Sequence, residues 1–136
     1  MHYPVKILVA WAEAIGGNAQ IRDWLMRNGY PELGLFVFAL YNQDKARQWL
    51  MTNGHPHLMA VVRGAEGDLR AVRWLQDNGY MALSKVALCG DGEDDAFAWL
   101  IANGHRELAI VARRIEIVKT GIEDDNKDPH MFNKNG

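Results

Sequence analysis

The sequence predicts an all-α protein, a solenoid of stacked antiparallel helical hairpins with about nine short helices. The first observation is a repeat: Trp-Leu pairs recur every 25 residues, beginning at positions 24, 49, 74 and 99. The second is an Asn-Gly pair at a fixed offset, beginning at positions 28, 53, 78 and 103. The third is apolar spacing of three and four within each unit, which is typical of helices. A fixed period of this length indicates a repeat architecture.

Each unit is predicted to contain two short helices. In the third unit, Leu58, Val61 and Ala65 share one face of the first helix, and the second helix covers about 68–78. The Asn-Gly pair ends the second helix, because glycine tolerates the left-handed conformation that closes a final turn. One hairpin of this size cannot bury its apolar face alone, so neighbouring hairpins are expected to stack.

We expect a single helical-repeat domain over residues 1–120. Its parts are four units and a closing helix, at 4–29, 30–54, 55–79, 80–104 and 105–119. The closing helix has charged residues that suit a polar cap on the stack: Arg106, Arg113, Arg114, Glu116 and Lys119. The segment 121–136 loses the period and is mostly polar, so we expect a loosely ordered tail.

The unit HPHLMAVVRGAEGDLRAVRWLQDNG resembles the ankyrin repeat. HPHLMAVVRGAEGDL is similar to the first helix and turn of an ankyrin unit, and RAVRWLQDNG, with its Trp-Leu-x-x-Asn-Gly ending, is similar to the second helix. The period is 25 residues instead of about 33, and His55-Pro56-His57-Leu58 is the nearest approach to the Thr-Pro-Leu-His motif. The missing residues correspond to the hairpin finger between ankyrin units. The resemblance implies a stack whose first helices line the concave side.

Positions that vary between units are candidates for a binding surface. On the first helices the candidate protein-binding residues are Lys6, Glu13, Phe38, Arg63, Lys85, Leu88 and Arg113. Aromatic and arginine side chains are the usual anchors of protein interfaces. The structural alternative is that Phe38 and Leu88 merely contact adjacent helices. We therefore predict a non-enzymatic protein–protein interaction module that binds an unidentified protein or peptide on its concave face.

Two other functions remain open. The second helices contain a row of cations that could bind a nucleic-acid backbone: Arg22, Lys45, Arg47, Arg70 and Arg73. Acidic residues interrupt this row and the net charge is −2, so a solvated face is favoured over nucleic-acid binding. The third function is self-association through the N-terminal helix, which is apolar on more than one face through Ile7, Val9, Ala10, Trp11 and Ile15.

The residues that could perform chemistry fall in structural columns of the repeat. The tryptophans are predicted to pack in the core, and Cys89 aligns with small residues and is expected to be buried. His55 and His105 share a column with tyrosines at the junction between units, and no zinc-ligand spacing is present. We predict no enzymatic activity, no cofactor and no metal.

Composition favours a soluble chain. No apolar run approaches the roughly 20 residues of a membrane span, and the N-terminus is too weakly basic for a secretory signal. Cys89 is the only cysteine, so the chain can form no intramolecular disulfide. A cytoplasmic location is the resulting expectation.

Overall fold

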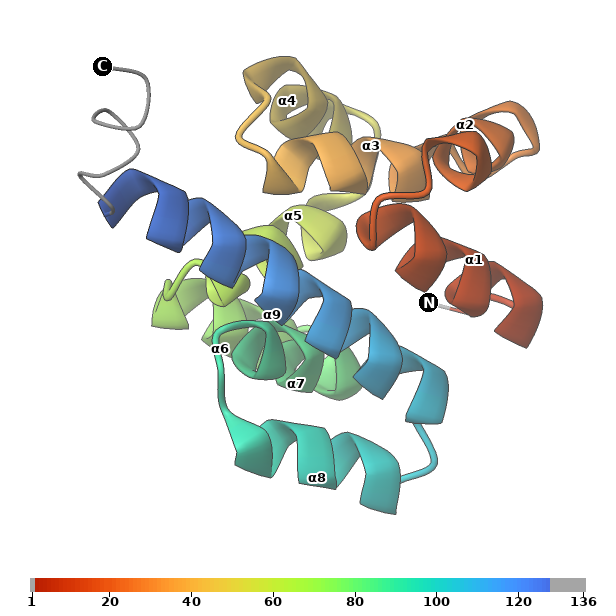
Figure 1. The fold of residues 1–136 in the computed structure, drawn as a ribbon. Helices are drawn as coiled ribbons and strands as arrows, with labels where there is room; N and C mark the ends of the chain where they lie inside the picture. The colour runs from red at the N-terminus through yellow and green to blue at the C-terminus, as the bar shows by residue number, and fades with distance from the viewer. Residues whose placement is uncertain (1, 128–136) are drawn as a thin grey trace.

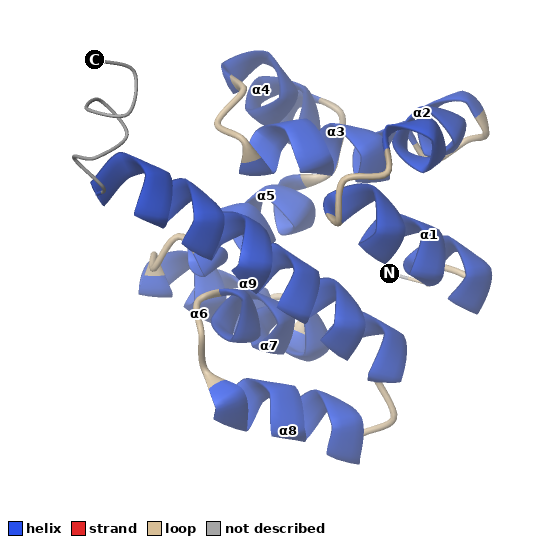
Figure 2. Ribbon diagram, in the orientation of Figure 1, coloured by secondary structure: helices blue, strands red, loops and turns tan. Residues whose placement is uncertain are grey.

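The computed structural model describes residues 2–127 of the chain. Within these residues it is all-helical, with nine helices and no strand, as the repeat predicts (Figures 1 and 2). The helices are α1 (Val5–Ile15), α2 (Ala19–Arg27), α3 (Pro31–Leu40), α4 (Asp44–Thr52), α5 (Pro56–Ala65), α6 (Leu69–Asp77), α7 (Met81–Gly90), α8 (Asp94–Ala102) and α9 (Arg106–Lys127). We call the odd-numbered helices first helices and the even-numbered ones second helices. In this part of the chain no helix has the length and apolar character needed to cross a membrane.

The recurring Asn-Gly pairs end the second helices. In all four units the asparagine side chain donates a hydrogen bond of 2.7–2.9 Å to the carbonyl oxygen four residues earlier. The glycines that follow have φ values between 79° and 94°: Gly29, Gly54, Gly79 and Gly104. Each pair therefore satisfies a carbonyl of the last turn and then lets the chain reverse. This local chemistry explains why Asn and Gly recur at a fixed offset.

The first helices lie side by side in chain order, and the row closes on itself. α3 lies between α1 and α5, α7 lies beside α5, and α9 contacts both α7 and α1. α9 also reaches α3 and α5, and Figure 1 shows it crossing between α1 and the α7–α8 hairpin. An open stack would keep its first and last helices apart. Here the first and last helices of the row, α1 and α9, are in contact.

The core is built from equivalent positions of the first helices. One column is fully buried in all five: Trp11, Phe36, Val61, Val86 and Val111. The Trp11 and Phe36 rings meet edge to face, with their centroids 5.0 Å apart. The second helices contribute a leucine each, all fully buried: Leu25, Leu50, Leu75 and Leu100. Burial of these side chains is the main source of stability for hairpins that could not fold singly.

The repeated tryptophans are not the core residues that the sequence suggested. Trp24 and Trp74 are exposed, while Trp49 and Trp99 are half-buried at the edge of the core. The leucine after each tryptophan takes the inward position, because adjacent helical residues point about 100° apart. The indoles of Trp49 and Trp99 instead stack on His55 and His105, with ring centroids 5.7 and 5.8 Å apart. His55 and His105, which were predicted to lie at the junctions between units, therefore stack on the tryptophans of the preceding second helices.

The last helix differs from the predicted polar cap. α9 continues to Lys127, well beyond position 119, so residues 121–127 are helical. The remainder of the predicted tail, 128–136, lies outside the described residues. Lys119 is buried, and its Nζ lies 3.1 Å from Glu66 and 3.4 Å from the carbonyl oxygen of Leu40. A cation is favourable there because Leu40 ends α3, where unpaired carbonyls carry partial negative charge.

Candidate functional site

A groove opens between the second helices α4 and α6, with α5 as its floor. Its volume is about 470 Å³. Its apolar lining consists of Met51, Pro56, Met59, Ala60, Ala71 and Trp74. We call this hollow the α4–α6 groove. Met51 and Trp74 are exposed large apolar side chains that lie on either side of the same hollow.

The groove exists because one column of the repeat contains a small residue at this unit. Ala60 forms part of the floor, whereas the equivalent positions of α3 and α7 are Leu35 and Lys85. Nζ of Lys85 lies 5.6 Å from the ring centre of Trp99, which is the counterpart of Trp74 in the next unit. A methyl group at position 60 leaves open the space that the longer side chains of Leu35 and Lys85 occupy in α3 and α7.

The rim of the α4–α6 groove is positively charged. Arg63 is exposed and forms no ion pair with another residue of the described chain. The Arg70 side chain is 94% exposed, and its Nε lies 3.3 Å from Asp68. Asp68 also accepts a hydrogen bond from the backbone N–H of Arg70 and so caps α6. Arg63 and Arg70 therefore flank an apolar hollow, and the one nearby carboxylate, Asp68, caps the start of α6.

The predicted concave strip is not brought together on one open face. The guanidinium of Arg22 in α2 lies 4.5 Å from the ring centre of Phe38, and Arg113 lies 4.2 Å from the ring centre of Phe97 in α8. These two strip residues therefore face the preceding second helix, as the structural alternative expected for Phe38. Lys85 covers Trp99, as described above.

The remaining strip residues lie apart from one another. Leu88 is half-buried beside the core, whereas Lys6 and Glu13 are exposed on α1. Only Arg63 among the seven predicted residues lines the α4–α6 groove.

The cations of the second helices form no continuous row. Arg47 donates to Glu66, to the carbonyl oxygen of Ala39 and to the side chain of Asn42. Arg22 lies over the ring of Phe38 and forms an ion pair with Asp23. Lys45, Arg70 and Arg73 remain exposed. The exposed cations are thus Lys45 on α4 and the neighbouring Arg70 and Arg73 on α6.

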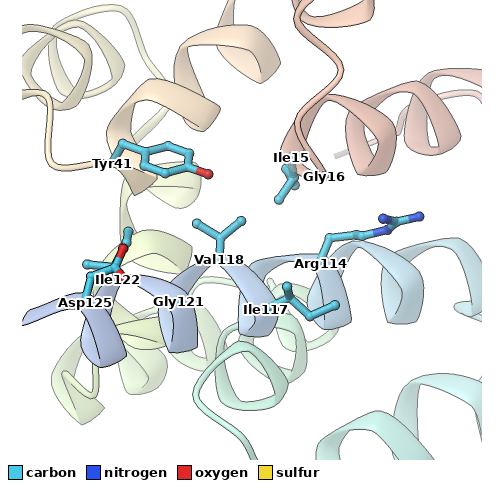
Figure 3. A pocket seen from close by; sticks show the side chains of 9 residues that line it. All are labelled: Ile15, Gly16, Tyr41, Arg114, Ile117, Val118, Gly121, Ile122 and Asp125. Atoms are coloured by element: carbon cyan, nitrogen blue, oxygen red, sulfur yellow. The ribbon is translucent and has the colours of Figure 1, made fainter. Parts of the chain in front are cut away.

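A second hollow, of about 300 Å³, lies where α9 passes the ends of α1 and α3 (Figure 3). The Tyr41 ring covers one side, and Val118 points toward it from α9 (Figure 3). Ile15, Ile117 and Ile122 add apolar surface. Ile117 is 67% exposed, so this hollow continues onto the open surface of α9.

Two side chains that could perform chemistry, Cys89 and His57, have pKa values shifted by burial. Cys89 is buried, as predicted, and burial raises the pKa of its thiol, which disfavours the reactive thiolate. Burial lowers the pKa of His57, whose ring stacks on Tyr80 with centroids 5.0 Å apart. Across residues 2–127, no cluster of three or more His, Cys, Asp or Glu is arranged to hold a metal ion.

Sequence reasoning did not find Met51, Met59 and Trp74 as groove residues. A signal was available in the column of Leu35, Ala60 and Lys85, where the side chain of the third unit is shorter than those of the units on either side. A small residue beside exposed methionine and tryptophan is the pattern of a hollow with a flexible apolar lining. Comparison with protein-family models, curated proteins and solved structures finds no match for this chain.

Proposed function

We propose that this protein is a non-enzymatic interaction module on an ankyrin-like helical repeat scaffold. Its site is the α4–α6 groove, and its ligand is a short amphipathic segment with acidic side chains beside an apolar anchor. The observation that carries this proposal is the pairing of an apolar hollow with the arginines at its rim, Arg63 and Arg70. An apolar residue of the ligand would enter the space above Ala60, and its carboxylates would meet the two guanidinium groups.

The chemistry of the lining supports this kind of ligand. Met51 and Met59 can adapt to different apolar side chains, because the thioether is flexible and polarisable. Trp74 offers a large rigid surface at modest entropic cost, which is why tryptophan is frequent among interface anchors. The arginine rim adds specificity, because a basic segment would be repelled at the same position.

The test uses the full chain and a fluorescent synthetic helix with leucines on one face and flanking glutamates. The key variant is Ala60→Leu, which reproduces the filled arrangement of the α3 unit and should therefore fold. Anisotropy titrations should show a loss of affinity of more than about tenfold for Ala60→Leu and for Arg63→Glu. Arg73→Glu is the matched control, because it makes the same charge change on α6 outside the groove.

Two results would contradict the proposal. One is an unchanged affinity of the acidic helix for a folded Ala60→Leu variant. The other is equal binding of a helix in which lysines replace the glutamates. Single-stranded and duplex nucleic acids are included as competitors. If they bind more tightly than the helix, and lose affinity steeply as salt rises, the nucleic-acid function is the better one.

A further inference from the structure

The second helices cover the seams between neighbouring first helices, but one seam has no cover. α2 contacts α1 and α3, α4 contacts α3 and α5, α6 contacts α5 and α7, and α8 contacts α7 and α9. The seam between α9 and α1 has no second helix in the described chain, although these two helices are in contact. Five first helices in a closed row thus have four outer helices. We call the uncovered strip the α1–α9 seam.

The side chains along the α1–α9 seam are apolar and exposed. On α1, Val5 and Val9 are exposed, and on α9, Ile110 and Ile117 are exposed. The equivalents of Val9 in the other first helices are buried, for example Met59. Among the described residues, no second helix lies against this face of α1 or the matching face of α9, which accounts for the exposure of Val9 and Ile110.

One residue of α9 departs from its repeat column beside the same uncovered seam. One column of the first helices holds small, buried residues in the first four units: Ala14, Ala39, Gly64 and Cys89. At Gly64 this column lies against both α7 and α6. In α9 this column holds Arg114. Arg114 is half-buried, and no second helix follows α9 among the described residues. Its guanidinium lies close to Gly16, which caps the C-terminal end of α1.

We propose that the α1–α9 seam is covered by the same seam of a second copy of this chain, in a two-fold dimer. α1 and α9 are equivalent first helices, in which Glu13 and Val9 correspond to Arg113 and Ala109. Arg114 and Ile110 each lie one residue further along α9, which is a rise of about 1.5 Å. A two-fold axis parallel to these helices places α1 of one copy on α9 of the other. Each Glu13 then meets an Arg114, and each Val9 meets an Ile110, so the surface is complementary to itself.

The charges at the seam are free to make this contact. Neither Glu13 nor Arg114 has an ion-pair partner among residues 2–127. Lys6 and Arg106 lie at the N-terminal rim of the seam, where water and salt screen their repulsion. The dimer therefore buries apolar side chains in its centre and pairs opposite charges at one end, which is the usual plan of a stable interface.

A charge exchange between copies tests the geometry. Glu13→Arg and Arg114→Glu should each weaken the homodimer more than about tenfold, because like charges then face each other twice. An equimolar mixture of the two variants should form heterodimers as stable as the native dimer, because both contacts are again between opposite charges. Sedimentation velocity of the full chains over a concentration series gives the dissociation constants, and native mass spectrometry identifies the heterodimer.

A second pair of variants leaves Arg114 untouched. Val9→Asp should give a monomer, because it places a charge in the α1–α9 seam. Ile101→Asp on α8 lies outside the seam and should remain a dimer. It is a matched control because the two native side chains are similarly exposed, at 47% and 48%. Circular dichroism shows that each variant is folded. A native chain that stays monomeric at the highest soluble concentration overturns the proposal. So does a mixture of the two charge variants that gains no heterodimer.

Discussion

Arg22 lies over the ring of Phe38, and the guanidinium carbon is 4.5 Å from the ring centre. The same contact occurs three units later with the two residue types exchanged, because Phe97 in α8 lies under Arg113 in α9 at 4.2 Å. Both pairs join a second helix to the first helix that follows it, at equivalent positions. Variation in these columns therefore reflects pairing within the chain, and a cation lies over an aromatic face at both sites. Arg113 also forms ion pairs with Asp94 and Glu116, at 3.1 and 2.9 Å.

This relationship predicts that the Arg22 and Phe38 side chains can be exchanged. Phe38→Arg alone should destabilise the protein by about 1 kcal/mol, because it removes the cation–π contact and places two guanidinium groups together. Adding Arg22→Phe should recover most of that loss, since the double variant reproduces the pair of α8 and α9. Urea unfolding followed by circular dichroism measures the three stabilities. If Arg22→Ala rescues Phe38→Arg equally well, relief of repulsion alone explains the recovery.

A second prediction concerns the turn between α3 and α4. Asn42 has a φ of 64°, and the equivalent residues of the other units are glycines with positive φ: Gly17, Gly67 and Gly92. Its side-chain oxygen also accepts a hydrogen bond of 2.8 Å from Nη2 of Arg47. Asparagine tolerates the left-handed region better than other residues with a Cβ, and it gains a contact that glycine lacks.

Asn42→Ala should therefore lower the free energy of unfolding by about 1–2 kcal/mol, because alanine is strained at this φ and loses the hydrogen bond. Asn42→Gly should be much milder, since it relieves the strain and loses only the hydrogen bond. Gly67→Ala is the control, because it strains the backbone at an equivalent turn without removing a side-chain hydrogen bond. Thermal and urea unfolding of the three variants give the ranking. An Asn42→Ala variant as stable as the native chain would show that the conformation is unstrained.

The helices and their ends could be predicted because their causes are local. Asn28 and Gly29 end α2 through a hydrogen bond and a backbone angle that involve only neighbouring residues. The same chemistry recurs in every unit, so the repeat itself reveals the helix count. The choice between Trp24 and Leu25 for the core was missed, because both are apolar neighbours and only the packing of α2 decides which of them points inward.

The closure of the row and the candidate grooves depend on contacts between distant residues. Lys119 contacts the carbonyl oxygen of Leu40, which is 79 residues away in the sequence. The 25-residue repeat does not predict this contact. Charge at position 119 suggested a solvated cap, whereas the structure uses it at the end of α3. The α4–α6 groove was missed for a related reason. A hollow is the space that neighbouring side chains leave unfilled. In the sequence alone, nothing distinguishes Ala60 from other small residues of a helix, although it lines the groove.

Glu66 links the closing helix to the second unit. Its carboxylate accepts hydrogen bonds from Arg47 at 2.9 and 3.1 Å and from Lys119 at 3.1 Å. Burial alone would raise the pKa of Glu66, but the hydrogen bonds and charges of Arg47 and Lys119 outweigh it and hold the pKa below its ordinary value of 4.5. The unfolded chain therefore takes up the Glu66 proton at higher pH than the folded one.

The stabilising effect of ionised Glu66 is accordingly complete above its unfolded pKa and is lost as pH falls through the lower, folded value. Glu66→Gln should cost about 1 kcal/mol near neutral pH, because Arg47 and Lys119 lose a charged acceptor. The difference between native and variant should shrink as the carboxylate is protonated. Urea unfolding of both proteins from neutral to acidic pH measures it, with Glu93→Gln as a control on an exposed carboxylate that has no ion pair within the described chain. A difference that stays constant with pH would show that the ionised form of Glu66 is not what holds α9 to the second unit.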